Sequence, residues 1–194
     1  MKTLILYYSF TGNNAWLATA LAEKLGCTVL QISEAAPRKK YSILLDLLFN
    51  RQSVLQDCPA LLDTYDLVIF ISPIWASRIA TPMATFLRKQ RDNVINYAFI
   101  SLCSGVSNQG NKIVQQLSTL LGKKPVAFAE IKVNDLLPPE QRNKIRYTTP
   151  YRVQPKHHSA LQMCIDEFIH HIIDFQDQNV QLMETNNPGK IQSK

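Results

Sequence analysis

The sequence predicts an α/β protein, a three-layer sandwich in which helices cover both faces of a five-stranded parallel sheet. Apolar runs that do not alternate, such as Thr3–Tyr8 and Asp66–Ser72, are typical of strands buried on both faces of a parallel sheet. Segments with apolar residues at helical spacing, such as Leu17, Leu21 and Leu25, follow these runs. Because strands and helices alternate along the chain, the sheet is expected to be parallel.

The individual elements follow from the same patterns. Strands are expected, in chain order, at Thr3–Tyr8, Cys27–Ile32, Asp66–Ser72, Asn96–Leu102 and Pro125–Val133. Helices are expected at Asn14–Leu25, Tyr41–Phe49, Thr81–Lys89, Asn108–Leu121 and Ser159–Phe175. The segment between the second and third strands holds an insertion, at about residues 37–62, in place of a plain helix. Residues 136–151 carry three prolines and are expected to be irregular.

Length and composition fit one globular domain. The chain has 194 residues, of which 46% are hydrophobic and 19% charged, and this suffices for a sizeable core. We expect a single domain at residues 1–175 and a flexible tail at 176–194, because the tail lacks aromatic residues and carries N-N-P-G-K. No apolar segment approaches the length of a membrane-spanning helix, and no cleavage site follows the short apolar N-terminus. These observations predict a cytoplasmic protein.

The net charge of +6 is compatible with several kinds of partner. It suits acidic proteins, anionic ligands, membrane surfaces or nucleic acid, and the charge alone does not choose among them. Nucleic acid is disfavoured because the basic residues are scattered and no strand interleaves them with aromatic residues. The cysteines show no metal-type spacing and are expected to be separate, reduced thiols at Cys27, Cys58, Cys103 and Cys164.

Three loops are expected to meet at one edge of the sheet. Parallel α/β sheets bind ligands beyond the carboxyl ends of their strands, where the strand order reverses. For the strand order 2-1-3-4-5, this point lies between the first and third strands. The loops at that edge are residues 9–14, 73–81 and 103–110.

The first loop suits a phosphate group. Ser9 and Thr11 supply hydroxyls, and Gly12 allows the backbone to bend closely around a ligand. Asn13 and Asn14 stand where a helix begins, so that N–H groups and the helix dipole favour an anion there. The alternative is an ordinary turn in which Ser or Thr caps the helix. The loop contains neither G-x-x-x-x-G-K-[ST] nor G-x-G-x-x-G, which excludes the two common nucleotide-binding motifs.

The second loop carries a tryptophan directly after a buried strand. We expect Trp75 to be partly exposed at the edge of the sheet, where it suits a planar aromatic ligand. The alternative is that Trp75 packs on a neighbouring loop. Arg78 is expected to be a solvated charge or a partner for a phosphate.

The third loop is small and polar. Gly105 and Gly110 permit close backbone approach, and Cys103 and Ser104 are placed to face the edge of a ring. No base adjacent to Cys103 is identifiable, so a nucleophilic thiol is not expected.

These loops resemble those of the flavodoxin family. Residues 9–14, S-F-T-G-N-N, resemble the family's phosphate loop T/S-x-T-G-N-T. Residues 65–87, which include S-P-I-W-A-S, resemble the strand, flavin loop and helix of flavodoxin-like FMN proteins, in particular NAD(P)H-dependent FMN reductases. The resemblance covers about residues 1–133 and implies that the chain binds FMN. It assigns the phosphate to Ser9, Thr11, Gly12, Asn13 and Asn14, and the isoalloxazine ring to Pro73, Ile74, Trp75, Ala76, Cys103, Ser104, Gly105 and Gly110.

The chain also departs from the family pattern. Asn14 replaces the usual threonine, and we expect its amide to donate to the phosphate. The third loop has no aromatic residue, and the chain is basic where electron-carrying flavodoxins are strongly acidic. The last two departures leave one ring face open to a substrate and argue against a plain electron carrier.

The resemblance implies an FMN-dependent oxidoreductase that reduces a quinone or similar small acceptor with NADH or NADPH. One alternative is a flavodoxin-type electron-transfer protein that docks to a redox partner protein. Another is a flavin-free interaction module with the same fold. No side chain is nominated as a catalytic acid or base, since the chemistry is that of the flavin. Many related reductases are dimers, which implies a homodimer.

Two further features are expected to be structural. The basic run from Arg38 to Lys40 is expected to be a solvated loop, with an acidic docking surface or the phosphates of NADPH as the functional alternatives. The adjacent histidines at 157–158 and 170–171 do not share a helix face, so no metal site is expected.

Overall fold

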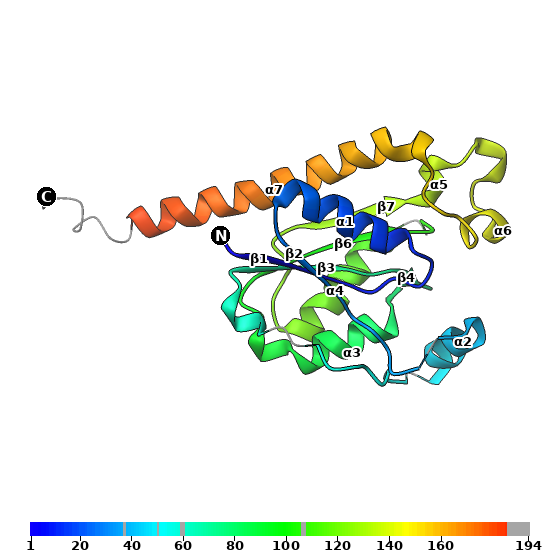
Figure 1. Cartoon of the computed structure of the whole chain (residues 1–194), viewed down its shortest axis with the longest axis horizontal. Helices are drawn as coiled ribbons and strands as arrows, with labels where there is room; N and C mark the ends of the chain where they lie inside the picture. The colour runs from blue at the N-terminus through cyan, green and yellow to red at the C-terminus, as the bar shows by residue number, and fades with distance from the viewer. Residues whose placement is uncertain (37, 50, 59–60, 106–107, 186–194) are drawn as a thin grey trace, which may run out of the picture.

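A computed structural model describes residues 1–36, 38–49, 51–58, 61–105 and 108–185. Five parallel strands form one sheet in the order β2-β1-β3-β6-β7 (Figure 1). When the two hairpin strands β4 and β5 are set aside, this order is 2-1-3-4-5, and the flavodoxin-like fold expected from the sequence is confirmed. The strands of the sheet are β1 (Thr3–Tyr7), β2 (Thr28–Gln31), β3 (Leu67–Ile71), β6 (Tyr97–Cys103) and β7 (Phe128–Lys132).

Helices cover both faces of the sheet (Figure 1). Alternate residues of a strand point to opposite faces. Ile69 of β3 accordingly packs with α1 (Asn13–Leu25) and α7 (His158–Thr185). Phe70, the next residue, packs on the other face with α3 (Thr81–Lys89) and α4 (Gly110–Leu121). Every residue of β3 is buried, as the unbroken apolar run predicted.

The remaining elements are short or lie in the insertion. The helix α2 (Lys40–Phe49) falls where the sequence predicted one, and it lies apart from the helices that cover the sheet, at the lower right of Figure 1. Residues 136–151 are less irregular than expected, because they contain short helices. The short helices of the chain are α5 (Val133–Leu136), α6 (Ile145–Thr148), and the 3-10 turns η1 (Leu62–Thr64), η2 (Arg91–Asn93), η3 (Pro139–Gln141) and η4 (Pro155–His157).

Two segments have more regular secondary structure than the sequence indicated. The last helix continues beyond Phe175, where the sequence predicted its end, as far as Thr185, because Gln, Leu, Met and Glu are good helix formers and no Gly or Pro interrupts them before residue 188. Residues 186–194 lie outside the described part of the chain. The second loop, for which the sequence predicted no strands, contains a hairpin of β4 (Ile74–Trp75) and β5 (Arg78–Ile79).

Two further observations concern the helices and the cysteines. Within the described residues, no helix combines the length and the apolar composition that a membrane crossing requires. Cys27, Cys58, Cys103 and Cys164 are free cysteines, of which Cys103 is buried and the other three are partly exposed.

Candidate functional site

The first loop passes from β1 into α1 through a left-handed turn at Gly12. Gly12 is the N-cap of α1 and has a φ of 89°, in the region that favours glycine. A Cβ placed on Gly12 would meet nothing within 4 Å, so the space beside it is open. No side chain of the described residues caps this helix, and the first N–H groups of a helix have no acceptor within it. The loop therefore presents N–H groups and the positive end of the helix dipole to an anion.

The hydroxyl of Ser9 supports this turn from the inside. Ser9 Oγ accepts a hydrogen bond from the Gly12 N–H at 3.1 Å. The hydroxyl proton of Ser9 remains available to a ligand, because the bond uses only an oxygen lone pair. Ser9 and Thr11 are both partly exposed. A cavity of about 440 Å³ lies against Ser9 and Phe10, on the side of β2.

Asn13 and Asn14 face inward, contrary to the expectation that Asn14 donates its amide to a phosphate. The Asn14 side chain is 2% exposed, and it both donates to the Leu102 carbonyl at 3.1 Å and accepts the Leu102 N–H at 3.0 Å. The Asn13 side chain donates to the Tyr151 carbonyl and accepts the Val153 N–H, each at 3.0 Å. These amides join α1 to β6 and to residues 151–153. The backbone N–H groups of Asn13 and Asn14 lie in the first turn of α1, where the helix itself offers them no acceptor.

The second loop is a tight hairpin with a strained turn. Trp75 pairs with Arg78, and the two residues between them, Ala76 and Ser77, have φ values of 47° and 56°. Residues other than glycine adopt such angles only when surrounding structure holds them there. Gln116 of α4 provides that support, because its side chain accepts the Ile79 N–H at 3.2 Å and donates to the Ser77 carbonyl at 2.9 Å.

The other two residues assigned to this loop connect the hairpin to the protein. Ile74 is 6% exposed and packs in the core on the α3 and α4 side of the sheet. The Pro73 carbonyl accepts the N–H of Ala80 at 3.1 Å, which closes the base of the hairpin. These contacts give Pro73 and Ile74 a structural role in the second loop.

Trp75 packs on the first loop while remaining partly exposed. Its ring lies edge-on to Tyr8 and Phe10, with centroid distances of 6.0 and 6.1 Å. The guanidinium carbon of Arg38 lies 5.5 Å from the centre of the Trp75 ring. Both alternatives offered by the sequence therefore hold in part, since Trp75 contacts a neighbouring loop and keeps an exposed surface.

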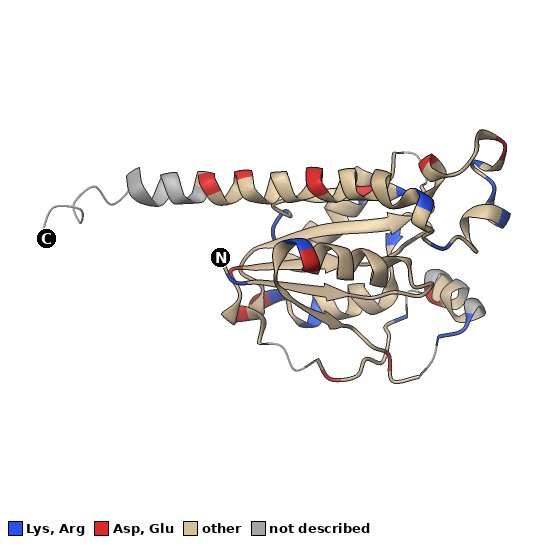
Figure 2. Ribbon diagram, turned by 45° about the horizontal axis from the view of Figure 1, so that its top comes forward, with Lys and Arg blue, Asp and Glu red and all other residues tan. Residues whose placement is uncertain are grey.

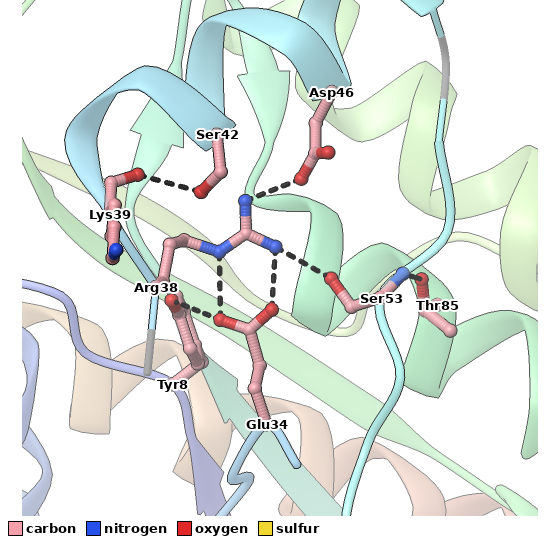
Figure 3. Close-up of polar contacts among 8 residues, drawn as sticks. All are labelled: Tyr8, Glu34, Arg38, Lys39, Ser42, Asp46, Ser53 and Thr85. Atoms are coloured by element: carbon pink, nitrogen blue, oxygen red, sulfur yellow. Dashed lines mark hydrogen bonds and ion pairs between the residues drawn. The ribbon is translucent and has the colours of Figure 1, made fainter. Parts of the chain in front are cut away.

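Arg38 is the centre of a buried polar network (Figure 3). Its guanidinium donates to both carboxylate oxygens of Glu34, at 2.7 and 2.6 Å, and to Ser53 Oγ at 2.8 Å. It also donates to the carboxylate of Asp46 on α2. The Arg38 side chain is 6% exposed, so the expectation of a solvated basic loop was wrong for this residue.

The Arg38 network joins the insertion to the first strand. The Tyr8 hydroxyl donates to Glu34 at 2.9 Å, and the Ser53 N–H donates to Thr85 Oγ1 of α3 at 3.1 Å (Figure 3). Burial raises the pKa of Tyr8, and the adjacent Glu34 carboxylate raises it further, so the phenol stays protonated. The insertion is thereby fixed beside Trp75 and the first loop.

The third loop is closed by glycine and by a buried amide. Gly105 has a φ of 90°, and a Cβ there would lie 2.9 Å from the Lys132 Cβ, so both space and conformation require glycine. The Gly105 carbonyl accepts the Asn134 amide at 3.0 Å. Ser104 is exposed, and Gly110 is the first residue of α4. Residues 106–107 of this loop lie outside the described part of the chain.

The Cys103 thiol is held in its protonated form. Its side chain is buried, and burial, together with the nearby Glu130 carboxylate, raises the pKa of Cys103 to about 12. A thiol with this pKa is a poor nucleophile at neutral pH. Cys103 therefore suits a role as an apolar wall of the loop.

Of the adjacent histidines, His157 and His158 contact aromatic residues at the start of α7, whereas His170 and His171 are exposed. The Tyr151 hydroxyl lies 2.7 Å from His157 Nδ1, and the His158 ring stacks on Trp16 with a centroid distance of 5.1 Å. Among the residues that the structure describes, no group of His, Cys, Asp or Glu is arranged to hold a metal ion.

Comparisons with known proteins agree with the fold. No protein-family model and no curated protein sequence matches the chain. Among solved structures, an FMN complex of a flavoprotein from Lactobacillus acidophilus is 21% identical and has a TM-score of 0.56, with 66% of this chain and 92% of that one covered. A protein assigned as a flavoprotein from Bacteroides eggerthii is 17% identical and has a TM-score of 0.60, with 87% and 98% covered. At these identities the likeness establishes a flavodoxin-like fold.

Proposed function

We propose that this protein is an FMN-binding oxidoreductase that uses NADH or NADPH to reduce a quinone or a similar small acceptor. The observation that carries the proposal is the open backbone cradle at Gly12, beside the partly exposed Trp75 at the same edge of the sheet. The similarity in fold to an FMN complex adds support. The cradle fits a phosphate that is bound through N–H groups without a cation.

The residues of the three loops would hold FMN in two parts. The N–H groups at the start of α1 and the hydroxyls of Ser9 and Thr11 would bind its phosphate. Trp75 would form one wall for its ring. The N–H groups of Ala76 and Gly105 would donate to the ring edge, where negative charge develops on reduction.

The bound flavin supplies the chemistry, since FMN accepts hydride and passes electrons onward. The chain itself contributes binding, orientation and exclusion of competing reactions. Tyr8 and Cys103 both remain protonated beside the site, so neither places a negative charge against the ring.

The test is reduction of the FMN-loaded protein under anaerobic conditions by NADH and NADPH, added separately. We expect at least one nucleotide to remove the visible flavin absorption within seconds to minutes, and a quinone to restore it. Flavin that stays oxidised with both nucleotides would contradict the enzymatic proposal and would favour an electron carrier that is reduced by a protein.

A further inference from the structure

A second candidate site lies beside the three loops. An open groove of about 880 Å³ runs between α2, α3 and α4. Its lining includes Arg78 and Ile79 of the hairpin, and Gln116, whose side chain holds the hairpin turn. A molecule in this groove would therefore contact the element that carries Trp75, without entering the space assigned to the flavin.

The groove is strongly cationic. Arg51, Arg78, Arg88 and Lys112 line it, and all four are exposed. Asp46 is the one carboxylate in the described lining, and Arg38 binds it from the protein side. Several of the acidic residues lie along α7, on the opposite face of the sheet (Figure 2). The four cations outnumber this one carboxylate in the described lining, so the groove attracts anions.

The side chains that line the groove indicate which class of anion it binds. No aromatic residue is present among the described residues that line the groove, so a nucleotide or a single-stranded nucleic acid would find no surface on which to stack its bases. Small-molecule sites are usually enclosed and mostly apolar, whereas this groove is open and lined by long polar side chains. Spaced cations in an open groove match the carboxylates of an extended protein segment.

We propose that this groove docks an acidic segment of a partner protein. Docking here would place the partner against the hairpin of the second loop. The proposed function enters this inference at one point, which is that a docked partner would gain access to the flavin. The binding of the acidic segment depends on the groove alone.

The experiment uses a fluorescein-labelled oligoglutamate peptide as the probe and the full chain, with and without FMN. We expect saturable binding that weakens as salt rises, with backbone amide shifts in two-dimensional NMR gathered on the groove residues Ala84 and Thr119. The double variant Arg88→Glu/Lys112→Glu should bind the peptide about tenfold more weakly or worse. A matched control, Lys89→Glu/Lys124→Glu, changes the net charge equally outside the groove and should bind as the unmodified chain does.

Several results would overturn the proposal. They are equal losses in the two double variants, shifts spread evenly over the basic surface, or tighter binding of single-stranded DNA or NADPH at the same residues. Self-association that the Arg88→Glu/Lys112→Glu variant abolishes would assign the groove to a second copy of the chain instead. If the protein fails to bind FMN but still binds the peptide, the missing FMN binding contradicts the proposed function and the docking site stands.

Discussion

The first and second loops of the candidate site are built in opposite ways. The turn of the first loop takes its shape from its own residues, through Gly12 at φ 89° and the Ser9 hydroxyl, while Asn14 ties the start of α1 to β6. The second loop has a strained turn that Gln116 holds from a distant helix. Its tryptophan packs on Phe10 and lies under Arg38 of the insertion. A phosphate cradle can thus be local, whereas the wall for a planar ring depends on residues far away in the sequence.

Loss of Arg38 should produce the largest effect. Arg38→Met leaves Glu34 and Asp46 without their cation, and their side chains are 12% and 10% exposed. Breaking a buried ion pair from one side costs about 3 kcal/mol or more. We expect urea unfolding to show this loss, with a change in Trp75 fluorescence before global unfolding. The exposed neighbour variant Lys39→Met should change stability by less than about 0.5 kcal/mol; similar values for both would show that Arg38 does not hold the second loop.

Asn14 tests how far the stability of the first loop depends on its contacts with β6. Asn14→Ala leaves the buried N–H and carbonyl of Leu102 without partners, which should cost about 2 kcal/mol in urea unfolding. Asn111→Ala on the exposed surface of α4 is the control and should be nearly neutral. If instead Asn14→Ala leaves stability unchanged and weakens only FMN binding, the side chain binds phosphate as the family resemblance implied.

Gly12 tests the charge of the cradle. Gly12→Asp and Gly12→Asn place side chains of the same shape at φ 89°, so they share the backbone strain and differ in one negative charge. FMN should bind the Asp variant at least about tenfold more weakly than the Asn variant, because the carboxylate repels the phosphate. Equal dissociation constants, measured by quenching of FMN fluorescence, would show that the phosphate binds elsewhere.

Gln116 tests the distant support of the second loop and should have the smallest effect. Gln116→Glu keeps an acceptor for the Ile79 N–H but sets a carboxylate against the Ser77 carbonyl. We expect a loss of about 1 kcal/mol in stability, with several-fold weaker FMN binding. Gln115→Glu, one residue earlier and exposed, makes the same chemical change away from the turn. A larger effect from Gln115→Glu would remove the support for this role.

The same contrast explains how much the sequence could predict. The strands follow from apolar runs such as Asp66–Ser72, whereas their order in the sheet is what the family resemblance implies. The turn of the first loop follows from its glycine and the helix that begins there. Arg38 could not be found in this way, since nothing adjacent to it in the chain reveals that Glu34, Asp46 and Ser53 converge on it. The inward turn of Asn14 likewise depends on a carbonyl and an N–H of β6 that only the folded chain brings near.

The measurement that tests the central claim most directly is an FMN titration of the Trp16→Phe variant, in which Trp75 is the remaining tryptophan of the two in the chain. If the first loop holds the phosphate and Trp75 walls the ring, FMN should quench the Trp75 fluorescence saturably, with one FMN bound per chain. Saturable FMN binding without quenching would place the ring away from the second loop. The absence of FMN binding would contradict the whole account of the site.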